Sequence, residues 1–397
     1  MRSGKRDSAA QSLRSGRLSM AAAVIVPAMV FVGVIAARYD GRPYLRGDCQ
    51  YYYYTAVSLA EDFDLDLRNQ LPPPMPRHDL DVALDQWGRL VPKHSMWMSL
   101  AALPLIALLG PPGALIFNLT QLLLLLLLAY VLARRYASNG ASAAAVILTA
   151  TTSFLPHYVW NFSADLFVTT ALIAGLVALP RDRRPSPWRH LVSGLLIGLS
   201  AVAKYSLILA IPGLVLLVGR PFKKTLPAFA TGFVVPVLLA ASLNFHLFGS
   251  PLVTPYDRMA IFDGGTPSVH THRTDFTLPL ATGMGGQLMD PRLGLIPTTP
   301  ITVLSLIGLM TLARRDLLPA LYIGSTSLAL FLFYSKYKWW VASHHGNRFL
   351  IPVVVLATIP LATLVDALAD RFRQRYGTPS SSRDEPKKRD GAEAPPY

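Results

Sequence analysis

The sequence predicts an all-α polytopic membrane protein, a bundle of about 10–11 transmembrane helices. Of its 397 residues, 52% are hydrophobic and only 15% are charged, whereas soluble domains carry about 25% charged residues. The hydrophobic residues also gather in long uncharged runs, among them 20–37 and 113–133, which holds seven consecutive leucines. Runs of roughly 18 or more apolar residues are long enough to span a bilayer as helices.

Eleven hydrophobic runs account for the predicted helices, and several contain Pro or Gly, which membrane helices tolerate. The run 96–109 is short, contains Pro104 and ends at Gly110, so we expect it to enter the membrane only half way. The runs 191–203 and 205–219 are also short. In order, the runs are 20–37, 96–109, 113–133, 142–156, 164–179, 191–203, 205–219, 226–244, 300–313, 317–334 and 349–368.

The basic residues predict which side of the membrane each connector faces. Of 37 lysines and arginines, 23 lie in the N-terminal arm 1–19, in four short connectors and in the tail 369–397. The positive-inside rule places these segments in the cytoplasm. This assignment needs an odd number of crossings between residues 95 and 134, which favours a half-inserted 96–109. The net charge of +14 then lies inside, where membrane lipids explain it better than nucleic acid does.

The long polar loops 38–95 and 245–299 and the shorter loop 335–348 therefore face the extracytoplasmic side. Long ordered loops commonly carry function. The tail 369–397 is polar and charged, and we expect it to be disordered. A single cysteine, Cys49, excludes a disulfide scaffold and a cysteine-based zinc site.

The first loop begins with Asp48 and then a tyrosine-rich segment, 50–61, whose spacing predicts a short amphipathic helix along the membrane surface. Tyrosines suit this interface because the ring is apolar and the hydroxyl is polar. Asp48 either caps this helix or acts as a general base that takes a proton from an acceptor hydroxyl. The residues alone leave both interpretations open.

Asp62, Asp64 and Asp66 alternate further along the first loop. The pattern lacks the glycine and closing glutamate of a calcium loop, so that motif is excluded. Alternating carboxylates can still bind a hard divalent cation, Mg²⁺ or Mn²⁺. The pattern fits a solvent-exposed face better. A divalent cation is therefore the one candidate cofactor, and the sequence does not require it.

Two ionisable residues border predicted membrane segments. Asp165, at the start of 164–179, is either a functional carboxylate at membrane depth or a helix N-cap. Lys204 either snorkels to the interface or binds an anionic head group. The third loop adds cations among aromatic residues, which predicts a phosphate-binding cradle or an aromatic belt with basic anchors; these residues are Lys336, Tyr337, Lys338, Trp339, Trp340, His344, His345 and Arg348.

The sequence contains no P-loop and no dinucleotide-binding glycine motif followed by a suitable acid. It also predicts no soluble domain that could hold a cytosolic nucleotide or nucleotide sugar. Any activated donor should therefore be a lipid that reaches the site through the membrane.

Four stretches together resemble bacterial membrane glycosyltransferases of the GT-C superfamily, similar to protein mannosyltransferases and aminoarabinose transferases. Each motif is loose alone, and their order along the chain carries the resemblance. This chain departs from the family in lacking a sizeable soluble C-terminal domain, and Ser343-His344-His345 stands where many relatives are glycine-rich. The stretches are 47–69, 194–204, 244–256 with 291–295, and 339–350.

The resemblance implies that Asp48 is the catalytic base. It implies a second acid that binds metal or substrate, for which Asp64, Asp66 and Asp165 are candidates. It implies that Arg348 holds the lipid phosphate. The further candidates for donor or phosphate binding are Lys204, His345, Lys338, Tyr52, His94 and Asn69.

The implied function is inverting transfer of a sugar from a polyprenyl-phosphate-linked donor to a glycan, lipid or protein outside the bacterial cytoplasmic (inner) membrane. The alternatives are a flippase or transporter of lipid-linked glycans, an O-antigen ligase or polymerase, and a structural membrane subunit. A transporter would not need two long polar loops on one face, and no inverted repeat is visible.

Overall fold

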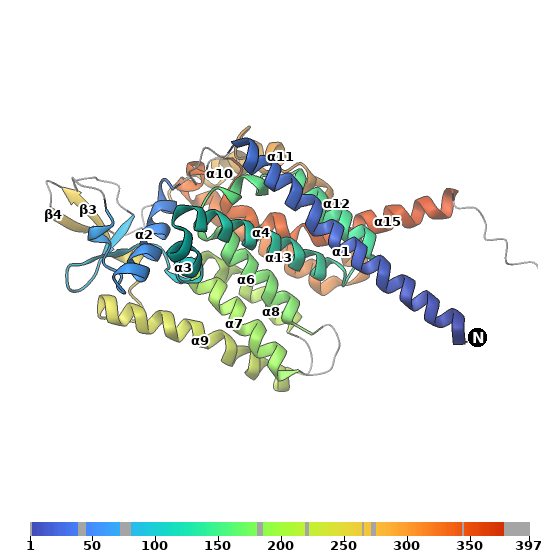
Figure 1. Ribbon diagram of the computed structural model, residues 1–397, viewed down its shortest axis with the longest axis horizontal. Coiled ribbons are helices and arrows are strands. Elements are labelled where there is room, and N and C mark those ends of the chain that lie inside the picture. Colours follow the sequence, from blue (N-terminus) through green and yellow to red (C-terminus); the bar gives the residue numbers. More distant parts are fainter. Residues whose placement is uncertain are drawn as a thin grey trace, which may run out of the picture.

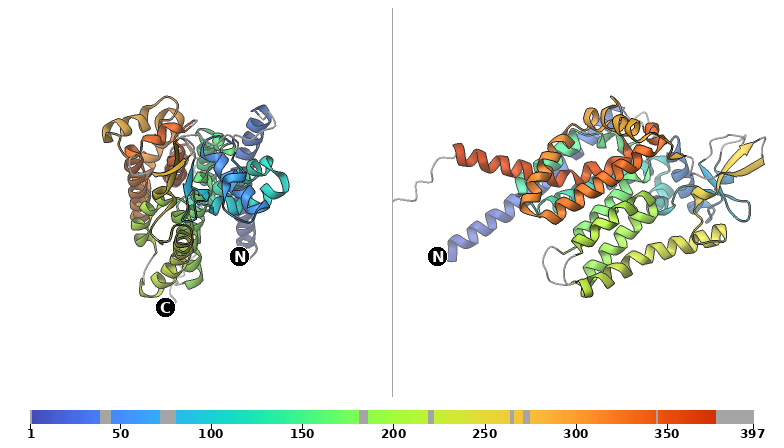
Figure 2. Two further views of the ribbon diagram at one scale, coloured as in Figure 1. Left: turned by 90° about the vertical axis from the view of Figure 1, so that its left-hand side faces the viewer. Right: turned by 180° about the vertical axis from the view of Figure 1, so that it is seen from behind.

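The protein is an elongated bundle of helices with a small β-sheet at one end (Figure 1). The computed structural model describes residues 2–38, 45–71, 81–180, 186–218, 222–263, 266–270, 275–343 and 345–376. Both ends of the described chain lie opposite the sheet, as the view from behind also shows (Figure 2). The predicted all-α polytopic fold is confirmed, since within the described ranges five helices are long and apolar enough to cross a membrane.

Each predicted hydrophobic run corresponds to helical structure in the described chain. The run 205–219 is divided into a 3₁₀ turn, Tyr205–Ala210, and a short helix, and the last run is divided near residue 357. Within the runs, the helices are α1 (Arg2–Arg38), α3 (Trp97–Leu109), α4 (Pro111–Ala133), α5 (Asn139–Thr151), α6 (Ala164–Ala178), α7 (Pro187–Ala203), α8 (Ile211–Leu217), α9 (Phe222–Phe248), α12 (Ile301–Arg315), α13 (Leu317–Lys336), α14 (Ile351–Leu356) and α15 (Thr358–Tyr376).

Helix α3 forms a tight hairpin with α4. Gly110 turns the chain with φ 60°, a conformation that favours glycine. A Cβ on Gly113 would lie 2.2 Å from the carbonyl oxygen of Leu105, so only glycine permits this approach. The 13 residues of α3 span about 20 Å at 1.5 Å per residue, which is less than the bilayer core. Half-insertion of α3 stays a prediction that this length supports.

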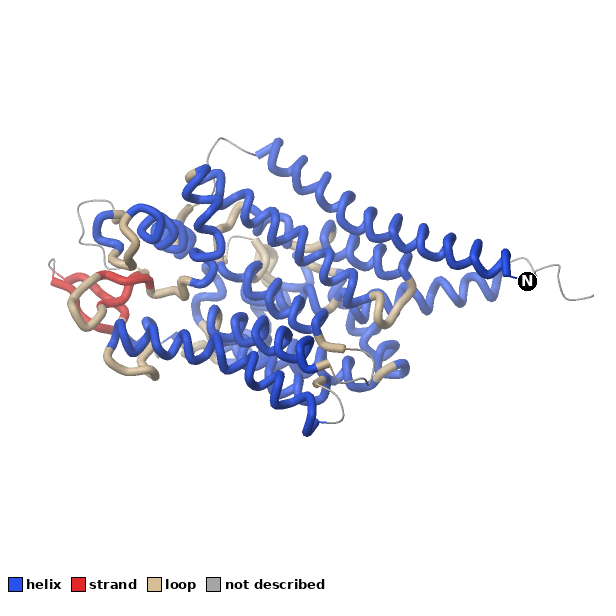
Figure 3. Tube along the Cα trace, turned by 60° about the horizontal axis from the view of Figure 1, so that its bottom comes forward, coloured by secondary structure: helices blue, strands red, loops and turns tan. Residues whose placement is uncertain are grey.

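The first and second polar loops join in one antiparallel sheet, shown in red in Figure 3. Its strand order is β2-β1-β3-β4, and the bridge between the loops pairs Ala83 with Met259. The sequence analysis did not predict this sheet, because strands of three to five residues are too short to show a period of two. The strands are β1 (Val82–Leu84), β2 (Leu90–Pro92), β3 (Met259–Asp263) and β4 (Thr266–His270).

Within the described residues, three further α-helices lie outside the predicted membrane runs. Helix α2 (Asp48–Glu61) confirms the predicted helix over 50–61 and packs against α3. Helices α10 (Leu280–Met289) and α11 (Leu295–Thr298) belong to the second loop, and α10 packs against α13. The second loop is therefore largely ordered structure.

The two terminal segments differ in part from the predicted boundaries. Helix α1 begins at Arg2 and runs through the predicted arm 1–19 without a break. Helix α15 continues to Tyr376, so the prediction of disorder is wrong for 369–376. The last turn of this helix carries Arg373 and Arg375, which interact favourably with the negative end of its dipole. The remaining tail, 377–397, lies outside the described residues.

Contacts among the basic connectors place them together at the end away from the sheet. Arg315 donates to the carbonyl oxygen of Tyr136 at 2.9 Å and to the Asp366 carboxylate at 2.7 Å. The other carboxylate oxygen of Asp366 accepts from the Ser138 backbone N–H. The connectors after α4 and after α12 thus meet beside α15, as the charge pattern predicts for segments on one side of a membrane.

Helices differ strongly in how much of their apolar surface the protein itself buries. In α1 and α9 only 17% of the apolar window is buried, against 67% in the window over 348–376. The last helices therefore lie in the centre, and α1 and α9 lie outside with apolar faces turned away from the bundle. Such faces suit a hydrocarbon solvent and not water.

Glycines set the separation of α7 and α9. A Cβ on Gly232 would lie 2.0 Å from the carbonyl oxygen of Leu191, and one on Gly194 would lie 2.0 Å from that of Phe229. Small residues let membrane helices pack backbone against backbone. This close packing fixes the end of α7, where Lys204 is placed.

We expect Gly232→Ala to lower stability by about 1–3 kcal/mol, because the added methyl group forces the two helices apart. The measurement is thermal unfolding of the purified protein in detergent. Gly33→Ala is the matched control, since nothing lies within 4 Å of a Cβ at Gly33 on α1. Equal melting temperatures for the two variants would contradict the proposed packing.

Candidate active site

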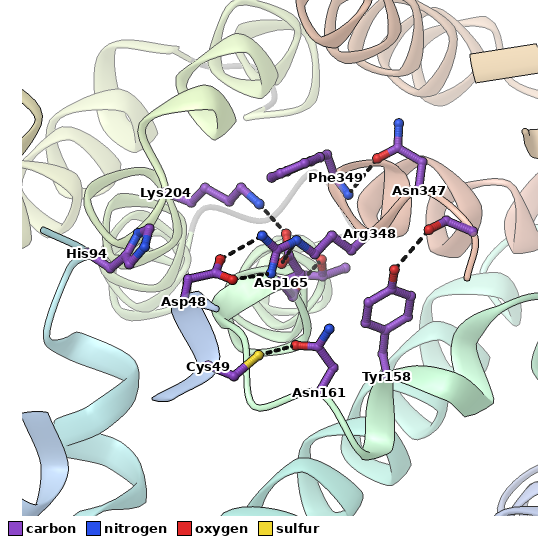
Figure 4. A network of polar contacts seen from close by, with 12 residues as sticks. Asp48, Cys49, His94, Tyr158, Asn161, Asp165, Lys204, Asn347, Arg348 and Phe349 are labelled. Carbon is purple, nitrogen blue, oxygen red and sulfur yellow. Dashed lines mark hydrogen bonds and ion pairs between the residues drawn. The ribbon is translucent and has the colours of Figure 1, made fainter. Parts of the chain in front are cut away.

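Four charged side chains meet where several helix ends converge (Figure 4). Asp48 is the first residue of α2, and Asp165 lies in the first turn of α6. Lys204 follows the last residue of α7, and Arg348 opens the 3₁₀ turn that leads into α14. Four segments that are far apart in sequence thus contribute one side chain each.

Arg348 and Asp48 form a two-pronged ion pair. The Nη1 and Nη2 atoms of Arg348 lie 3.1 and 2.6 Å from the two carboxylate oxygens of Asp48. The side chains are only 10% and 20% exposed. A planar guanidinium matches a carboxylate or a phosphate through two parallel hydrogen bonds, so the same fork suits either anion.

The second pair joins Asp165 to Lys204, and it touches the first. Lys204 is hydrogen-bonded to the Asp165 carboxylate, and Nε of Arg348 lies 3.9 Å from the other oxygen of Asp165. The Lys204 ammonium also lies 4.4 Å from the ring centroid of Phe349, a cation–π contact. Two carboxylates and two cations balance to zero net charge, which is how buried charges are tolerated.

The backbone that precedes Arg348 is fixed by the conformation and contacts of Gly346. Gly346 has φ 66°, and a Cβ there would lie 2.1 Å from the Phe154 ring, so a larger residue cannot occupy this position. The hydroxyl of Tyr158 donates to the carbonyl oxygen of Gly346 at 2.9 Å. The turn before Arg348 is therefore tied to the segment between α5 and α6.

Asn347 adds a second, fully buried anchor. Its Nδ2 donates to Oε1 of Gln287 at 2.9 Å, and its Oδ1 accepts from the Phe349 N–H. Gln287 in turn donates to Oγ of Ser335 at 2.7 Å. These hydrogen bonds connect α10, α13 and the turn that begins at Arg348. They hold the backbone of Arg348 in place and so help to position its guanidinium group.

Burial and the neighbouring charges act in opposite directions on Asp48. Burial alone would raise the pKa of this carboxyl, but the Arg348 guanidinium and then His94 outweigh it, so the pKa is lower than usual. Opposite charge and hydrogen bonding to the charged form have this effect. Asp48 is thus held ionised and paired.

For three residues the structure removes one of the two open interpretations. N-capping by Asp48 is wrong, because Gly47 is the N-cap and Asp48 directs its carboxylate to Arg348. N-capping by Asp165 is also wrong, since Ser163 holds that position. Lys204 does not snorkel, because its ammonium is engaged by the buried Asp165.

The structure also brings His94 and Tyr52 to the site. Their rings stack at 5.1 Å, and Nδ1 of His94 lies 3.1 Å from the hydroxyl of Tyr256 in the second loop. Asp81 lies behind His94, with a carboxylate oxygen 3.9 Å from Nε2, and is hydrogen-bonded to Lys93. Loops one, two and three therefore share this end of the bundle, as the sequence predicts.

Three other predicted residues have partners that are outside the four-charge cluster. Lys338 pairs with Asp275 at 2.7 Å, Asn69 donates to Asp62 at 2.7 Å, and the His345 ring lies 4.1 Å from that of His157. A role for them at this cluster is not supported by these contacts. His344 lies outside the described residues.

Within the described residues, the contacts of Asp64 and Asp66 are hydrogen bonds of a turn. Asp64 accepts from Ser58 Oγ and from the Asp66 N–H. Asp66 accepts from the N–H groups of Arg68 and Leu90. Within the part of the chain that the structure describes, no three His, Cys, Asp or Glu side chains group as metal ligands. Both carboxylates act as acceptors in a turn, and a divalent cation at these two residues stays a prediction.

Several residues of the site were missed by the sequence analysis. Asp81 was missed because its contact with Lys93 depends on the unpredicted β1–β2 hairpin. Cys49 donates through Sγ to Oδ1 of Asn161 at 2.6 Å, and burial raises the pKa of this thiol. Asn161 precedes α6 in the sequence and is not among the predicted site residues. No local sequence pattern indicates that the Asn161 amide lies beside Cys49.

The sequence model of glycosyltransferase family 87 matches residues 96–335. The chain belongs to this family. The predicted membrane glycosyltransferase is therefore confirmed. A transporter and a structural subunit, the two non-enzymatic alternatives, do not agree with membership of this family. Comparison with curated protein sequences gives no match.

The family 87 chain is also similar in fold to ArnT from Cupriavidus metallidurans. The crystal structure of ArnT bound to undecaprenyl phosphate matches with a TM-score of 0.51 and 15% identity, over 89% of this chain and 61% of ArnT. Apo ArnT matches with a TM-score of 0.52, also at 15% identity, over 87% and 60%. This chain thus spans about three fifths of ArnT, and the likeness shows a shared polytopic membrane fold.

Removing Arg348 should cost stability. We expect Arg348→Gln to lower it by about 3–5 kcal/mol, because the Asp48 carboxylate is left buried without its partner. Adding Asp48→Asn should restore part of the loss, and thermal unfolding of the single and double variants measures it. A double variant as unstable as the sum of the two single changes would contradict the coupling.

Proposed function

We propose that this family 87 enzyme transfers a sugar from a polyprenyl-phosphate-linked donor to a hydroxyl group of a cell-envelope glycan, lipid or protein. The observation that carries the proposal is the two-pronged pair of Asp48 and Arg348 at the mouth of an apolar bundle. It joins a candidate base to a cation that suits a phosphate. The structure of ArnT with undecaprenyl phosphate supports the choice of donor.

The donor binds by exchange at Arg348. A polyprenyl chain is soluble only in the hydrocarbon region, and its phosphate stays at the polar end of the bundle. There the phosphate oxygens compete with the Asp48 carboxylate for the fork of Arg348, which accepts either anion with the same geometry. Lys204 lies close enough to add a second positive charge, while still paired with Asp165.

Donor binding in this way also frees the base. While Arg348 holds both oxygens of Asp48, the carboxylate has a low pKa and little tendency to accept a proton. Once the guanidinium turns to the phosphate, the basicity of the carboxylate increases. The ion pair of the ligand-free enzyme therefore keeps Asp48 a weak base until a donor binds.

The transfer is a single inverting displacement. Asp48 takes the proton of the acceptor hydroxyl, and the acceptor oxygen forms a bond to the anomeric carbon. The bond from that carbon to the phosphate oxygen breaks at the same time, and polyprenyl phosphate leaves with the electron pair. Arg348 stabilises the charge that develops on the leaving oxygen.

The charge pattern supports an extracytoplasmic site in the bacterial cytoplasmic membrane. Basic connectors gather around Asp366 and Arg315 at one end, and Asp48 and Arg348 lie at the other. By the positive-inside rule, the end with the connectors faces the cytoplasm. A donor carried on a lipid is accessible from the opposite side without any soluble nucleotide site.

We expect Asp48→Asn to lower transfer by at least about 10²-fold, because an amide cannot accept the proton. The assay supplies a radiolabelled polyprenyl-phosphate hexose or pentose with an envelope extract as the acceptor source, and measures release of free polyprenyl phosphate. Asp62→Asn is the matched control, since Asp62 is exposed at the far end of the same helix and bonds Asn69 and Gln70. Wild-type turnover in Asp48→Asn would refute the assignment.

A further inference from the structure

The exchange of Arg348 in the proposed function creates an electrostatic problem at Asp48. A buried carboxylate that has lost its main cation has a raised pKa. It would then be protonated in mildly acidic surroundings, and a protonated carboxyl group cannot act as a base. The donor-bound enzyme therefore needs another positive charge close to Asp48. The following inference rests on the proposed function.

The described structure places an imidazole where such a charge is needed. Asp48 and Tyr52 are separated by four residues on α2 and so lie on one face of the helix. The His94 ring stacks on Tyr52 with centroids 5.1 Å apart and planes at 25°. In the close view, His94 and Arg348 lie on opposite sides of Asp48 (Figure 4). Loss of one cation therefore leaves the other in place.

The surroundings of His94 suit a protonated ring. Nδ1 lies 3.1 Å from the Tyr256 hydroxyl, which can accept a hydrogen bond. Nε2 is buried without a hydrogen-bond partner, and the nearest carboxylate oxygen of Asp81 is 3.9 Å away. A proton on Nε2 would give Asp81, which already pairs with Lys93, a second cation at that distance, and the His94 side chain is only 12% exposed.

We infer that His94, in its protonated form, is the positioning residue that keeps Asp48 ionised once Arg348 has moved to the donor phosphate. In the described state the charge on His94 already lowers the pKa of Asp48, second to Arg348 among the charges that do so. Asp81 holds the imidazolium and keeps it from solvent. The charged and titratable groups that face Asp48 or His94 are Cys49, Tyr52, Asp81, Lys93, Asp165, Lys204, Tyr256, Tyr337 and Arg348.

The direction of the pH dependence follows from the two charges. An imidazole carries a positive charge only when it is protonated, which low pH favours. At high pH, where the ring is neutral, the presence of His94 makes little difference to Asp48. At lower pH the imidazolium favours the ionised carboxylate, so wild-type enzyme keeps its base active further into the acidic range than a variant without the charge.

His94→Gln tests this, because glutamine can still bond the Tyr256 hydroxyl but carries no charge. Transfer is measured against pH with saturating polyprenyl-phosphate sugar, so that the profile reports the donor-bound enzyme. We expect about a tenfold loss near pH 5.5 and less than a twofold loss near pH 8, which corresponds to a shift of the acidic limb by about one unit. His246→Gln on α9, whose ring contacts Trp87, is the matched control and should keep the wild-type profile.

A second variant keeps the inference testable if His94→Gln folds poorly. Tyr256→Phe removes the hydroxyl that holds Nδ1 and should shift the acidic limb in the same direction by less. An equal loss at every pH, or an unmoved acidic limb in both variants, would overturn the role of His94. Absence of transfer by the wild-type enzyme at every pH would instead overturn the proposed function, and the inference with it.

Discussion

The pairing of Asp48 with Arg348 is the interaction on which the arrangement of the active site depends. Its two members are 300 residues apart in sequence and come from opposite ends of the membrane domain. A charged group in such an apolar setting is costly unless an opposite charge and hydrogen bonds satisfy it. Folding can therefore place Asp48 here only if the last helical segment brings Arg348 to it, which links the first loop to the end of the chain.

The same constraint explains why several buried contacts fix the position of Arg348. The positive φ of Gly346 and the buried amides of Asn347 and Gln287 fix its backbone. The Asp165–Lys204 pair completes a neutral group of four charges. Neutrality holds only while no ligand is bound. A phosphate adds a negative charge, and the network can accept it by moving one guanidinium from a carboxylate to the phosphate, so binding and activation of the base become a single event.

Much of the membrane fold follows from the sequence because its signals are local. Uncharged runs such as 113–133 predict a helix by length alone, and Arg134, Arg135, Arg314 and Arg315 predict by their positions which connectors lie on the same side of the membrane. The β-sheet escaped prediction because its strands are short and its key contact, Ala83 with Met259, joins two loops. The boundary at Tyr376 was missed because polar composition was taken to indicate disorder.

The sequence predicts which charged residues belong to the site, but it does not predict which of them form pairs. Asp48 and Arg348 stand out as charged residues beside membrane helices, and their proximity could be guessed from the shared side of their loops. That Asp165 pairs with Lys204, and that Asp81 stands behind His94, depends on helix ends and a hairpin that no local pattern specifies. Asp64 and Asp66 illustrate the reverse case, since in the structure both of these alternating acids accept hydrogen bonds within a turn.

The most direct test of the account is a pair of experimental structures of this protein in lipid, one without ligand and one with undecaprenyl phosphate. The account predicts that the Arg348 fork contacts Asp48 in the first structure and the phosphate oxygens in the second, with Asp165 and Lys204 still paired in both. A phosphate bound elsewhere, with the Asp48–Arg348 pair intact, would contradict the exchange and with it the central claim.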